Sequence, residues 1–340
     1  MMDQETPLVS IMISVYNQLH CLNKALESAL DQTYNNMEII ISDDFSTDGD
    51  VESYLNRYDD PRIKYFRNPK NLGVSGNFRN LLNTYSSGDL ALMLNADDYL
   101  TDNTFIEKAV NIFTRENEVA LVFGDVKILI ENSGELISDS SNDAVPKIMN
   151  GNSFFLNYWK GYSLPHLTCL YDRQHALSLG FYLSDSISDD LESLFRLVIN
   201  KKVGHISYPV GVLVRHQQNF TKSVKSYFKD SATDFIDKPY EYALNNTNIE
   251  PGILEKWRLK MLRRYYLKIL VKLHFLAPDR ISDYKLIIKN RHPEVYHKVT
   301  KDIRYFLFKM IALQPWLLRF IFKKVFKQES FIADLLQYKD

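Results

Sequence analysis

The sequence contains only two cysteines, Cys21 and Cys169, among its 340 residues. Two cysteines cannot build a disulfide framework or a multi-cysteine metal site, and their scarcity is typical of a reducing cytoplasm. The start, MMDQETPLVS, lacks the basic, apolar and small-residue pattern of a secretory signal. No run reaches 18 apolar residues, because Lys309, Gln314 and Arg319 interrupt the most apolar candidate. These absences predict a cytoplasmic protein without a membrane-spanning helix.

Internal repeats and low-complexity tracts are also absent, and the composition, with 45% apolar and 24% charged residues, is that of a globular protein. Charge is unevenly distributed, although the formal net charge is −1. Residues 251–340 contain 20 Lys and Arg against 8 Asp and Glu, so residues 1–250 carry the acidic excess. This division predicts different roles for the two parts.

Short apolar runs alternate with helix-like segments through the first 125 residues. The expected strands are 8–16, 37–44, 62–67, 89–98 and 119–130, and helices are expected at 19–31 and 74–85. This alternation predicts an α/β fold with a mostly parallel sheet flanked by helices. In such sheets ligands bind beyond the carboxyl ends of the strands, so the polar residues that follow the expected strands are candidates for a site.

The rest of the chain has a less regular pattern. We expect a polar loop and an aromatic helix within 131–165, a strand at 167–172, a helix at 188–202 and a strand at 205–216. The predicted organisation is a catalytic domain over 1–222, a polar linker over 223–250 and a basic amphipathic helical region over 251–340. Within the catalytic domain, a nucleotide-binding half of about 6–125 precedes an acceptor half of about 126–222.

Three acidic segments can carry chemistry. Carboxylates in LNADD (94–98) suit Mn²⁺ or Mg²⁺ at the end of a strand, or they cap a turn. The segment ISDDFSTDGD (41–50) can accept hydrogen bonds from a nucleotide base or ribose, or it forms an ordinary turn. The acids of SDDLES (188–193) can supply a general base, or they complement the dipole of a helix N-terminus.

The order and spacing of these segments decide between the alternatives. SVYN, EIIISDDFSTDGD, NPKNLGVSGNF, LNADDYL and ISDDLESLFRL together resemble the inverting GT-A glycosyltransferases of family 2, over about residues 6–222. The resemblance implies a GT-A fold and transfer of a sugar from a nucleotide diphosphate to a hydroxyl group, with inversion. UDP is the common donor nucleotide of that family.

The resemblance also implies roles for individual residues. Nucleotide and donor contacts are expected from Tyr16, Asp43, Asp44, Asn71, Gly73, Asn77 and Asn95. Asp97, supported by Asp98, is expected to bind Mn²⁺ or Mg²⁺. His216 is expected to approach the diphosphate or the metal, or else it is an ordinary surface histidine. Asp190 is the expected general base, with Asp189 beside it on the acceptor side.

Three positions depart from the family pattern. Asn95 stands where an Asp is usual, so it offers an oxygen without a charge. Phe45 replaces the usual Gly after the paired acids, and Asp189 replaces the usual Glu. We expect Asn95 to affect the affinity for metal, and Phe45 to affect the shape of the loop beside the nucleotide base. The side chain of Asp189 is one methylene shorter than that of Glu.

The basic C-terminal region lies outside the resemblance. It contains two tryptophans, Trp257 and Trp316, and an amphipathic segment with apolar Leu318, Ile321, Phe322 and Val325 opposite basic Arg319, Lys323 and Lys327. This pattern predicts peripheral contact with an anionic membrane, and the alternative is a helical subdomain packed on the catalytic domain. No segment resembles a nucleic-acid recognition module.

With the family resemblance, the basic region predicts a lipid-linked glycan acceptor at the inner face of the plasma membrane, in O-antigen or capsule assembly. Two other classes of function remain. A nucleotidyltransferase usually has a basic, glycine-rich loop near its N-terminus, which SVYNQLHCLN lacks. A non-catalytic module that binds sugar or lipid would not need Asp97 and Asp190 together.

Overall fold

The computed structural model of the chain describes residues 6–138, 142–184, 186, 188–216 and 224–306. One mixed sheet runs through it in the order β3-β2-β1-β4-β9-β6-β10-β5, with β7 paired to β6 and β8 to β10. Its strands are β1 (Val9–Val15), β2 (Met37–Asp43), β3 (Ile63–Arg67), β4 (Leu90–Asn95), β5 (Tyr99–Leu100), β6 (Val119–Ile130), β7 (Glu135–Ser138), β8 (Ile148–Asn150), β9 (Cys169–Asp172) and β10 (Lys202–Arg215).

The first four strands pair in parallel, as the alternating pattern predicts. The crossovers between them contain α1 (Leu22–Leu30), α2 (Val51–Leu55), α3 (Gly73–Asn80) and the π-helical turn η1 (Leu81–Tyr85). All seven residues of β2 are buried, which explains the apolar Ile39, Ile40 and Ile41 in its middle. The five strands predicted in the first 130 residues are confirmed.

The second half of the sheet brings a distant segment to the same edge. β9 is antiparallel to both β4 and β6, and β10 is parallel to β6. Therefore β10 runs in the same direction as β1, β2 and β4, and its carboxyl end lies at the edge where theirs end. The residues that follow β4 and β10 can consequently meet.

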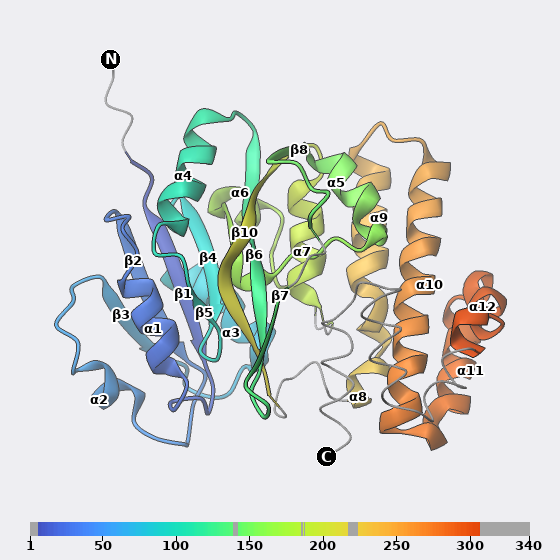
Figure 1. The fold of residues 1–340 in the computed structure, drawn as a ribbon, viewed down its shortest axis with the longest axis horizontal. Coiled ribbons are helices and arrows are strands. Elements are labelled where there is room, and N and C mark those ends of the chain that lie inside the picture. The colour runs from blue at the N-terminus through green and yellow to red at the C-terminus, as the bar shows by residue number, and fades with distance from the viewer. Residues whose placement is uncertain (1–5, 139–141, 185, 187, 217–223, 307–340) are drawn as a thin grey trace.

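Helices cover both faces of the sheet (Figure 1). The core on one face joins β1, β2 and β4 to α1 and to α4 (Phe105–Arg115). The core on the other face includes residues of α5 (Gly151–Asn157), α6 (Arg173–Ser178), α7 (Asp189–Val198) and several C-terminal helices. Alternate residues of β1 supply the two cores, with Ile11 and Ile13 on the first face and Met12 on the second.

The segment 223–250 is not the polar linker that the sequence predicts. It contains α8 (Val224–Tyr227), a 3₁₀ turn η5 (Asp230–Thr233) and α9 (Asp234–Asn246). Phe235, Ile236 and Ala243 are buried in the main core, and α9 packs against α7. A few apolar residues at helical spacing hold this helix in place, although polar residues surround them in the sequence.

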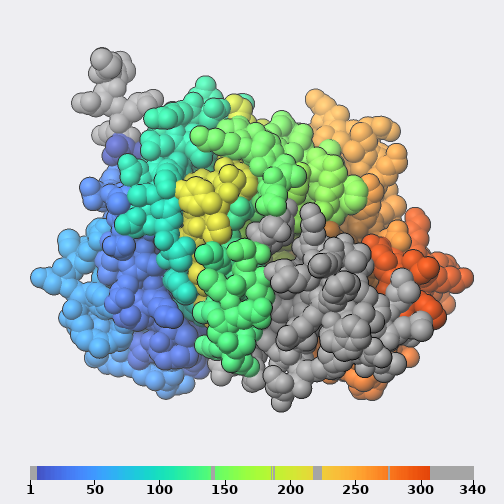
Figure 2. Space-filling model, in the orientation of Figure 1, coloured from blue at the N-terminus to red at the C-terminus, as the bar shows by residue number. Residues whose placement is uncertain are grey.

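The C-terminal helices are α10 (Pro251–Leu276), α11 (Ile281–Arg291) and α12 (Pro293–Thr300), with a 3₁₀ turn η6 (Pro278–Arg280) before α11. Trp257 on α10 is 2% exposed, and its ring centroid lies 4.0 Å from that of Phe155 and 5.9 Å from that of Phe195. The surfaces of α5 and α10 adjoin in the space-filling view (Figure 2). Trp257 is therefore a core residue and does not face a membrane, which corrects the sequence-based interpretation.

The part of 251–306 that the structure describes thus packs on the sheet domain, as the alternative interpretation predicts. The amphipathic segment from Trp316 to Lys327 lies outside the described residues. None of the helices in the described part is long and apolar enough to cross a bilayer.

Candidate active site

Asp43 is the last residue of β2 and is fully buried. Its Oδ1 atom accepts a hydrogen bond from Ser46 N (2.7 Å), and its Oδ2 atom accepts from Tyr65 OH (3.2 Å) and from the Arg67 guanidinium. Arg67 ends the neighbouring strand β3 and also donates to Ser46 O (2.8 Å). Sequence analysis missed Arg67, although its place at the carboxyl end of an expected strand was a usable signal.

Asp44 fixes the turn that follows β3. Its Oδ1 atom accepts from Asn68 Nδ2 (2.9 Å) and Leu72 N (2.8 Å), and its Oδ2 atom accepts from Gly73 N (3.0 Å). Gly73 N also donates to Asn71 Oδ1 (2.9 Å). Gly73 has φ +73°, a conformation that glycine adopts without strain. The structure therefore brings Asp44, Asn71 and Gly73 together, as the sequence predicts.

Asn77 is only 1% exposed and bonds to protein atoms. Its Nδ2 atom donates to Ser14 Oγ (2.9 Å) and Ser42 O (3.1 Å), and its Oδ1 atom accepts from Ser42 Oγ (2.6 Å) and Asn68 Nδ2 (3.0 Å). These bonds join α3 to the ends of β1 and β2. In this structure Asn77 therefore anchors α3 to the sheet and does not face solvent.

Tyr16 follows β1 and is 48% exposed. The next residue, Asn17, has φ 51°, and it reaches the loop after β2 through Asn17 N to Ser46 Oγ (3.0 Å) and Thr47 N to Asn17 Oδ1 (2.8 Å). Tyr16 therefore stands beside the loop that begins with the paired acids at the end of β2.

Asp97 and His216 meet at the edge where β4 and β10 end. His216 Nε2 lies 2.7 Å from Asp97 Oδ2, and both side chains are largely buried. Asn95 ends β4, where it pairs in register with Ser14 of β1, and its carbonyl oxygen accepts from Asp98 N (3.1 Å). The predicted proximity of His216 to the acidic segment is thus found.

Asp98, the predicted supporting metal ligand, bonds to the backbone of β10 in this structure. Its Oδ1 atom accepts a hydrogen bond from Val214 N (2.8 Å), so the carboxylate secures β10, and the residue is 4% exposed. Burial raises the pKa of Asp98, and the adjacent Asp97 carboxylate raises it further. The hydrogen bond from Val214 N to Asp98 therefore ties the end of β10 to the acidic segment after β4.

Within the described ranges, no group of three or more His, Cys, Asp or Glu side chains is arranged to hold a metal ion. Asp97 and His216 alone offer one carboxylate and one imidazole. That donor set fits Mn²⁺, and Mg²⁺ less closely, when diphosphate oxygens and water complete the coordination. Asp97 and His216 therefore fit a metal ion that binds together with a diphosphate group.

Asp189 and Asp190 begin α7 and form an acidic pair. Asp189 Oδ1 accepts from Asp190 N (2.8 Å), whereas the buried Asp189 Oδ2 has no hydrogen-bond partner among the described residues. Burial and, to a smaller extent, the Asp190 carboxylate raise the pKa of Asp189 to about 7, and the nearby Ser75 hydroxyl opposes the shift. Ser75 belongs to α3, so the acidic pair adjoins the element that Asn77 anchors.

Two further polar residues near Asp190 were not predicted. His166 Nε2 lies 2.9 Å from Tyr182 OH, which lies 3.1 Å from Tyr171 OH. Burial lowers the pKa of His166, and the charge of Asp190 opposes that effect, which shows that the two residues are near each other. A single histidine in a loop without a motif gave no signal in the sequence.

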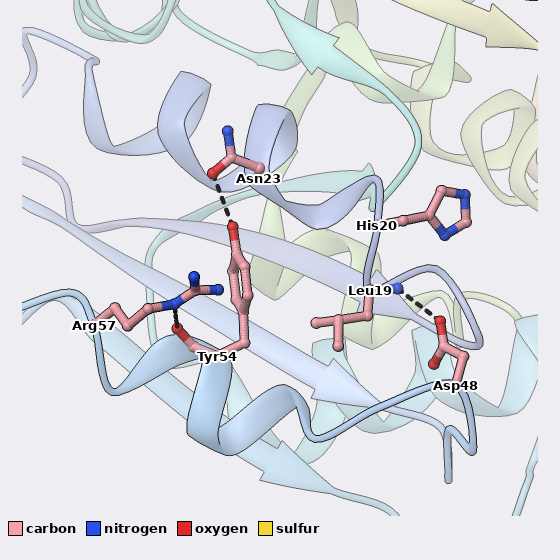
Figure 3. Close-up of a pocket in the computed structure, with 6 residues that line it drawn as sticks. All are labelled: Leu19, His20, Asn23, Asp48, Tyr54 and Arg57. Carbon is pink, nitrogen blue, oxygen red and sulfur yellow. Dashed lines mark hydrogen bonds between the residues drawn. The ribbon is translucent and has the colours of Figure 1, made fainter.

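An open pocket of about 580 Å³ lies between the start of α1 and the helix α2 (Figure 3). Asp48 Oδ2 accepts from Leu19 N (3.0 Å) there, and Tyr54 OH donates to Asn23 Oδ1 (2.8 Å). None of the predicted site residues lines this pocket. The candidate site is therefore defined by the convergent side chains at the sheet edge.

Part of the chain is similar to known glycosyltransferases. Residues 10–171 match the model of the family described as "Glycosyl transferase family 2". The matched range includes the segments with Asp43, Asp44 and Asp97, and it ends before Asp189, Asp190 and His216.

A curated relative, the "GalNAc(5)-diNAcBac-PP-undecaprenol beta-1,3-glucosyltransferase" of Campylobacter jejuni, is 36% identical over 148 residues. The match covers 42% of this chain and 44% of the relative. The chain spans less than two thirds of the length of such curated relatives.

Solved structures share the fold over nearly the whole chain. S. aureus TarS 1-349 in complex with UDP-GlcNAc has a TM-score of 0.64 at 14% identity, covering 97% of this chain and 89% of that one. The mannosyltransferase PcManGT from Pyrobaculum calidifontis in complex with GDP-Man and Mn²⁺ has a TM-score of 0.55 at 13% identity, with coverages of 98% and 86%. The fold is therefore that of GT-A glycosyltransferases, and within it residues 10–171 are similar to glycosyl transferase family 2.

Proposed function

We propose that the protein is an inverting glycosyltransferase that moves a sugar from a UDP-sugar to a hydroxyl group of a lipid-linked glycan, in O-antigen or capsule assembly. Tyr16, Asp43, Asp44, Asn71 and Gly73 form or shape the donor site, with Asn77 and Asn95 at its base. Asp97 and His216 hold Mn²⁺ or Mg²⁺, and Asp190 is the general base.

The contact between Asp97 and His216 carries this proposal. The two residues follow different strands, and their 2.7 Å contact forms at the sheet edge where Asp43 and the loop after β1 also lie. A diphosphate placed there would meet one carboxylate and one imidazole, which are suitable partners for a hard divalent cation that also binds phosphate oxygens. When bound, such a cation stabilises the negative charge of the departing nucleoside diphosphate.

Asp190 is the member of the acidic pair better suited to accept a proton. It is partly exposed and can meet an acceptor hydroxyl, whereas Asp189 is only 5% exposed. Asp190 would remove the proton from the acceptor hydroxyl as that oxygen attacks the anomeric carbon. Attack from the side opposite the leaving diphosphate inverts the anomeric centre. Asp189 would keep Asp190 in place through the Asp190 N–H.

The donor and acceptor classes follow from the relatives. The TarS structure contains UDP-GlcNAc, and the Campylobacter relative is named for a PP-undecaprenol acceptor. A UDP-sugar and a sugar on a polyprenyl diphosphate are accordingly the substrates that we propose for this chain.

A basic stripe on α10 supports peripheral contact with the membrane. Lys256, Lys260 and Arg264 recur at spacing four and are exposed. Lys260 Nζ lies 3.7 Å from the ring centroid of Trp159, and Arg264 donates to Trp159 O (2.9 Å). Cations beside an amphipathic aromatic suit an anionic bilayer surface, so we place the enzyme at the inner face of the plasma membrane.

The reaction can be tested with defined acceptors. The protein is incubated with a UDP-sugar, Mn²⁺ and one of three acceptors: a polyprenyl-diphosphate sugar, the same sugar free in solution, or polyprenyl diphosphate alone. We expect sugar transfer only to the lipid-linked sugar, with the new linkage inverted relative to the donor. Transfer to the free sugar alone would contradict the proposed acceptor, and release of pyrophosphate would indicate a nucleotidyltransferase.

A further inference from the structure

Phe45 adopts a conformation that its residue type disfavours. It directly follows the buried Asp43 and Asp44, and its φ is 67°. Only five non-glycine residues in the described ranges have positive φ, namely Asn17, Phe45, Glu118, Tyr182 and Asn200. A bulky side chain in this region strains the backbone, whereas glycine does not. A glycine at position 45 would therefore relieve strain.

Hydrogen bonds on both sides keep Phe45 in this conformation. On one side Asp44 N donates to Val15 O (2.8 Å). On the other side Ser46 N donates to Asp43 Oδ1 (2.7 Å), and Arg67 donates to Ser46 O (2.8 Å). The loop is thus fixed by its neighbours, and burial of the Phe45 ring contributes little because the residue is 44% exposed.

A second exposed aromatic residue follows the neighbouring strand. Tyr16, Phe45, Tyr208 and Phe306 are the exposed large aromatics in the part of the chain that the structure describes. Tyr16 and Phe45 both follow ends of adjacent strands, because Val15 of β1 lies opposite Asp43 of β2. Arg67 lies over the Phe45 ring, with its guanidinium carbon 5.2 Å from the centroid. The cation covers one face of the ring and leaves the rest to solvent.

Strain retained at a site next to exposed aromatic surface indicates a binding role. We propose that Phe45 is a donor-binding residue, held in the left-handed conformation so that its ring stacks on the planar base of the donor nucleoside diphosphate. This inference rests on the proposed function. It adds that the base stacks on Phe45, while Arg67 lies against the ring. The strained backbone of Phe45 lowers the stability of the free protein.

The test compares two glycine substitutions. Phe45→Gly removes both the ring and the strain, and Glu118→Gly removes strain at an exposed turn before β6, away from the site. Thermal unfolding and calorimetric titration of UDP, GDP and pyrophosphate are measured with Mn²⁺ for the wild type and both variants. We expect both variants to have a higher Tm than the wild type.

Binding then separates the two variants. Phe45→Gly should bind the preferred nucleoside diphosphate about tenfold or more weakly, since base stacking on an aromatic ring has this magnitude. It should bind pyrophosphate like the wild type, and Glu118→Gly should bind all three ligands like the wild type. Phe45→Tyr, which keeps a ring, should restore nucleotide affinity.

Other outcomes overturn the inference. Unchanged nucleotide affinity in Phe45→Gly would show that the ring does not contact the base. An equal loss for pyrophosphate would show that the substitution deforms the loop. If the wild type binds pyrophosphate but no nucleoside diphosphate, the base-binding role is wrong. If it binds none of the three ligands, the proposed function fails together with this inference.

Discussion

His216 Nε2 lies 2.7 Å from Asp97 Oδ2, although 119 positions separate the two residues in the sequence. The contact exists because β10 runs parallel to β6 and therefore ends at the same edge as β4. It joins a residue within the family 2 match to one beyond it. The proposed metal site thus depends on both halves of the sheet.

Removing either residue should weaken the response to metal. Asp97→Ala is expected to abolish Mn²⁺-dependent binding of nucleoside diphosphate, because it removes the carboxylate that contacts His216 at the proposed metal site. His216→Ala should raise the Mn²⁺ concentration needed for half-maximal binding by about tenfold or more. His297→Ala, at an exposed histidine on α12, is the control and should leave that concentration unchanged. A normal Mn²⁺ response in Asp97→Ala would contradict the metal assignment.

Asp190→Asn should separate catalysis from binding. A positioned base typically contributes about 10²–10⁴-fold, so kcat should fall by that factor while the Kd for the donor stays near the wild-type value. Asp59→Asn, at an exposed position between α2 and β3, should change neither quantity. Steady-state rates and calorimetric donor titration check this, and near-normal turnover in Asp190→Asn would exclude Asp190 as the base.

Asp189 should make the free energy of unfolding depend on pH. Its pKa in the folded protein, about 7, lies above its ordinary value of 3.8, so the folded state retains the proton longer than the unfolded state. The contribution of Asp189 to the free energy of unfolding is therefore fully present below pH 4 and is lost as the pH rises through about 7. Asp189→Asn should therefore gain stability relative to the wild type between pH 4 and pH 8, by up to about 4 kcal/mol.

Denaturant unfolding at several pH values measures this gain. Asp283→Asn, whose parent side chain is exposed in α11, should follow the wild-type curve throughout. Parallel curves for the wild type and Asp189→Asn would show that Asp189 ionises normally in the folded protein.

The basic stripe gives a prediction about membrane binding. Replacing Lys256, Lys260 and Arg264 by Glu should greatly reduce co-sedimentation with vesicles that contain anionic phospholipid, because attraction near such a surface amounts to about 1 kcal/mol per basic residue. Binding to zwitterionic vesicles should stay low for both proteins. Equal binding of the wild type and the triple variant to anionic vesicles would show that another surface makes the contact.

Much of the sheet was predictable because several of its strands are buried and rich in apolar residues. Composition alone predicts β2 from MEIIISDD and β6 from VALVFGDVKILI. The rule that ligands bind beyond the carboxyl ends of parallel strands then identified the acidic residues that follow as site candidates. In contrast, α9 depends on three or four apolar residues within a polar segment, which periodicity over a short window does not reveal. Trp257 was misread because an isolated tryptophan on a basic helix fits a core and a bilayer equally well.

In the candidate site, the sequence predicted which residues gather but not what each side chain touches. Asp98 and Asn77 were expected at the ligand, and the structure places them in bonds to Val214 and to Ser14 and Ser42. The direction of a side chain is set by the backbone groups that need a partner, and these become known only once the strands are paired.

The most direct test of the account measures release of nucleoside diphosphate from UDP-, GDP- and dTDP-sugars, with Mn²⁺, Mg²⁺ or EDTA and a bacterial glycolipid extract as acceptor. We predict release from one donor class, stimulated by metal, abolished by EDTA and lost in Asp97→Ala. Folded protein that releases nothing from any donor, in the presence of intact acceptor, would contradict the proposed glycosyltransferase activity.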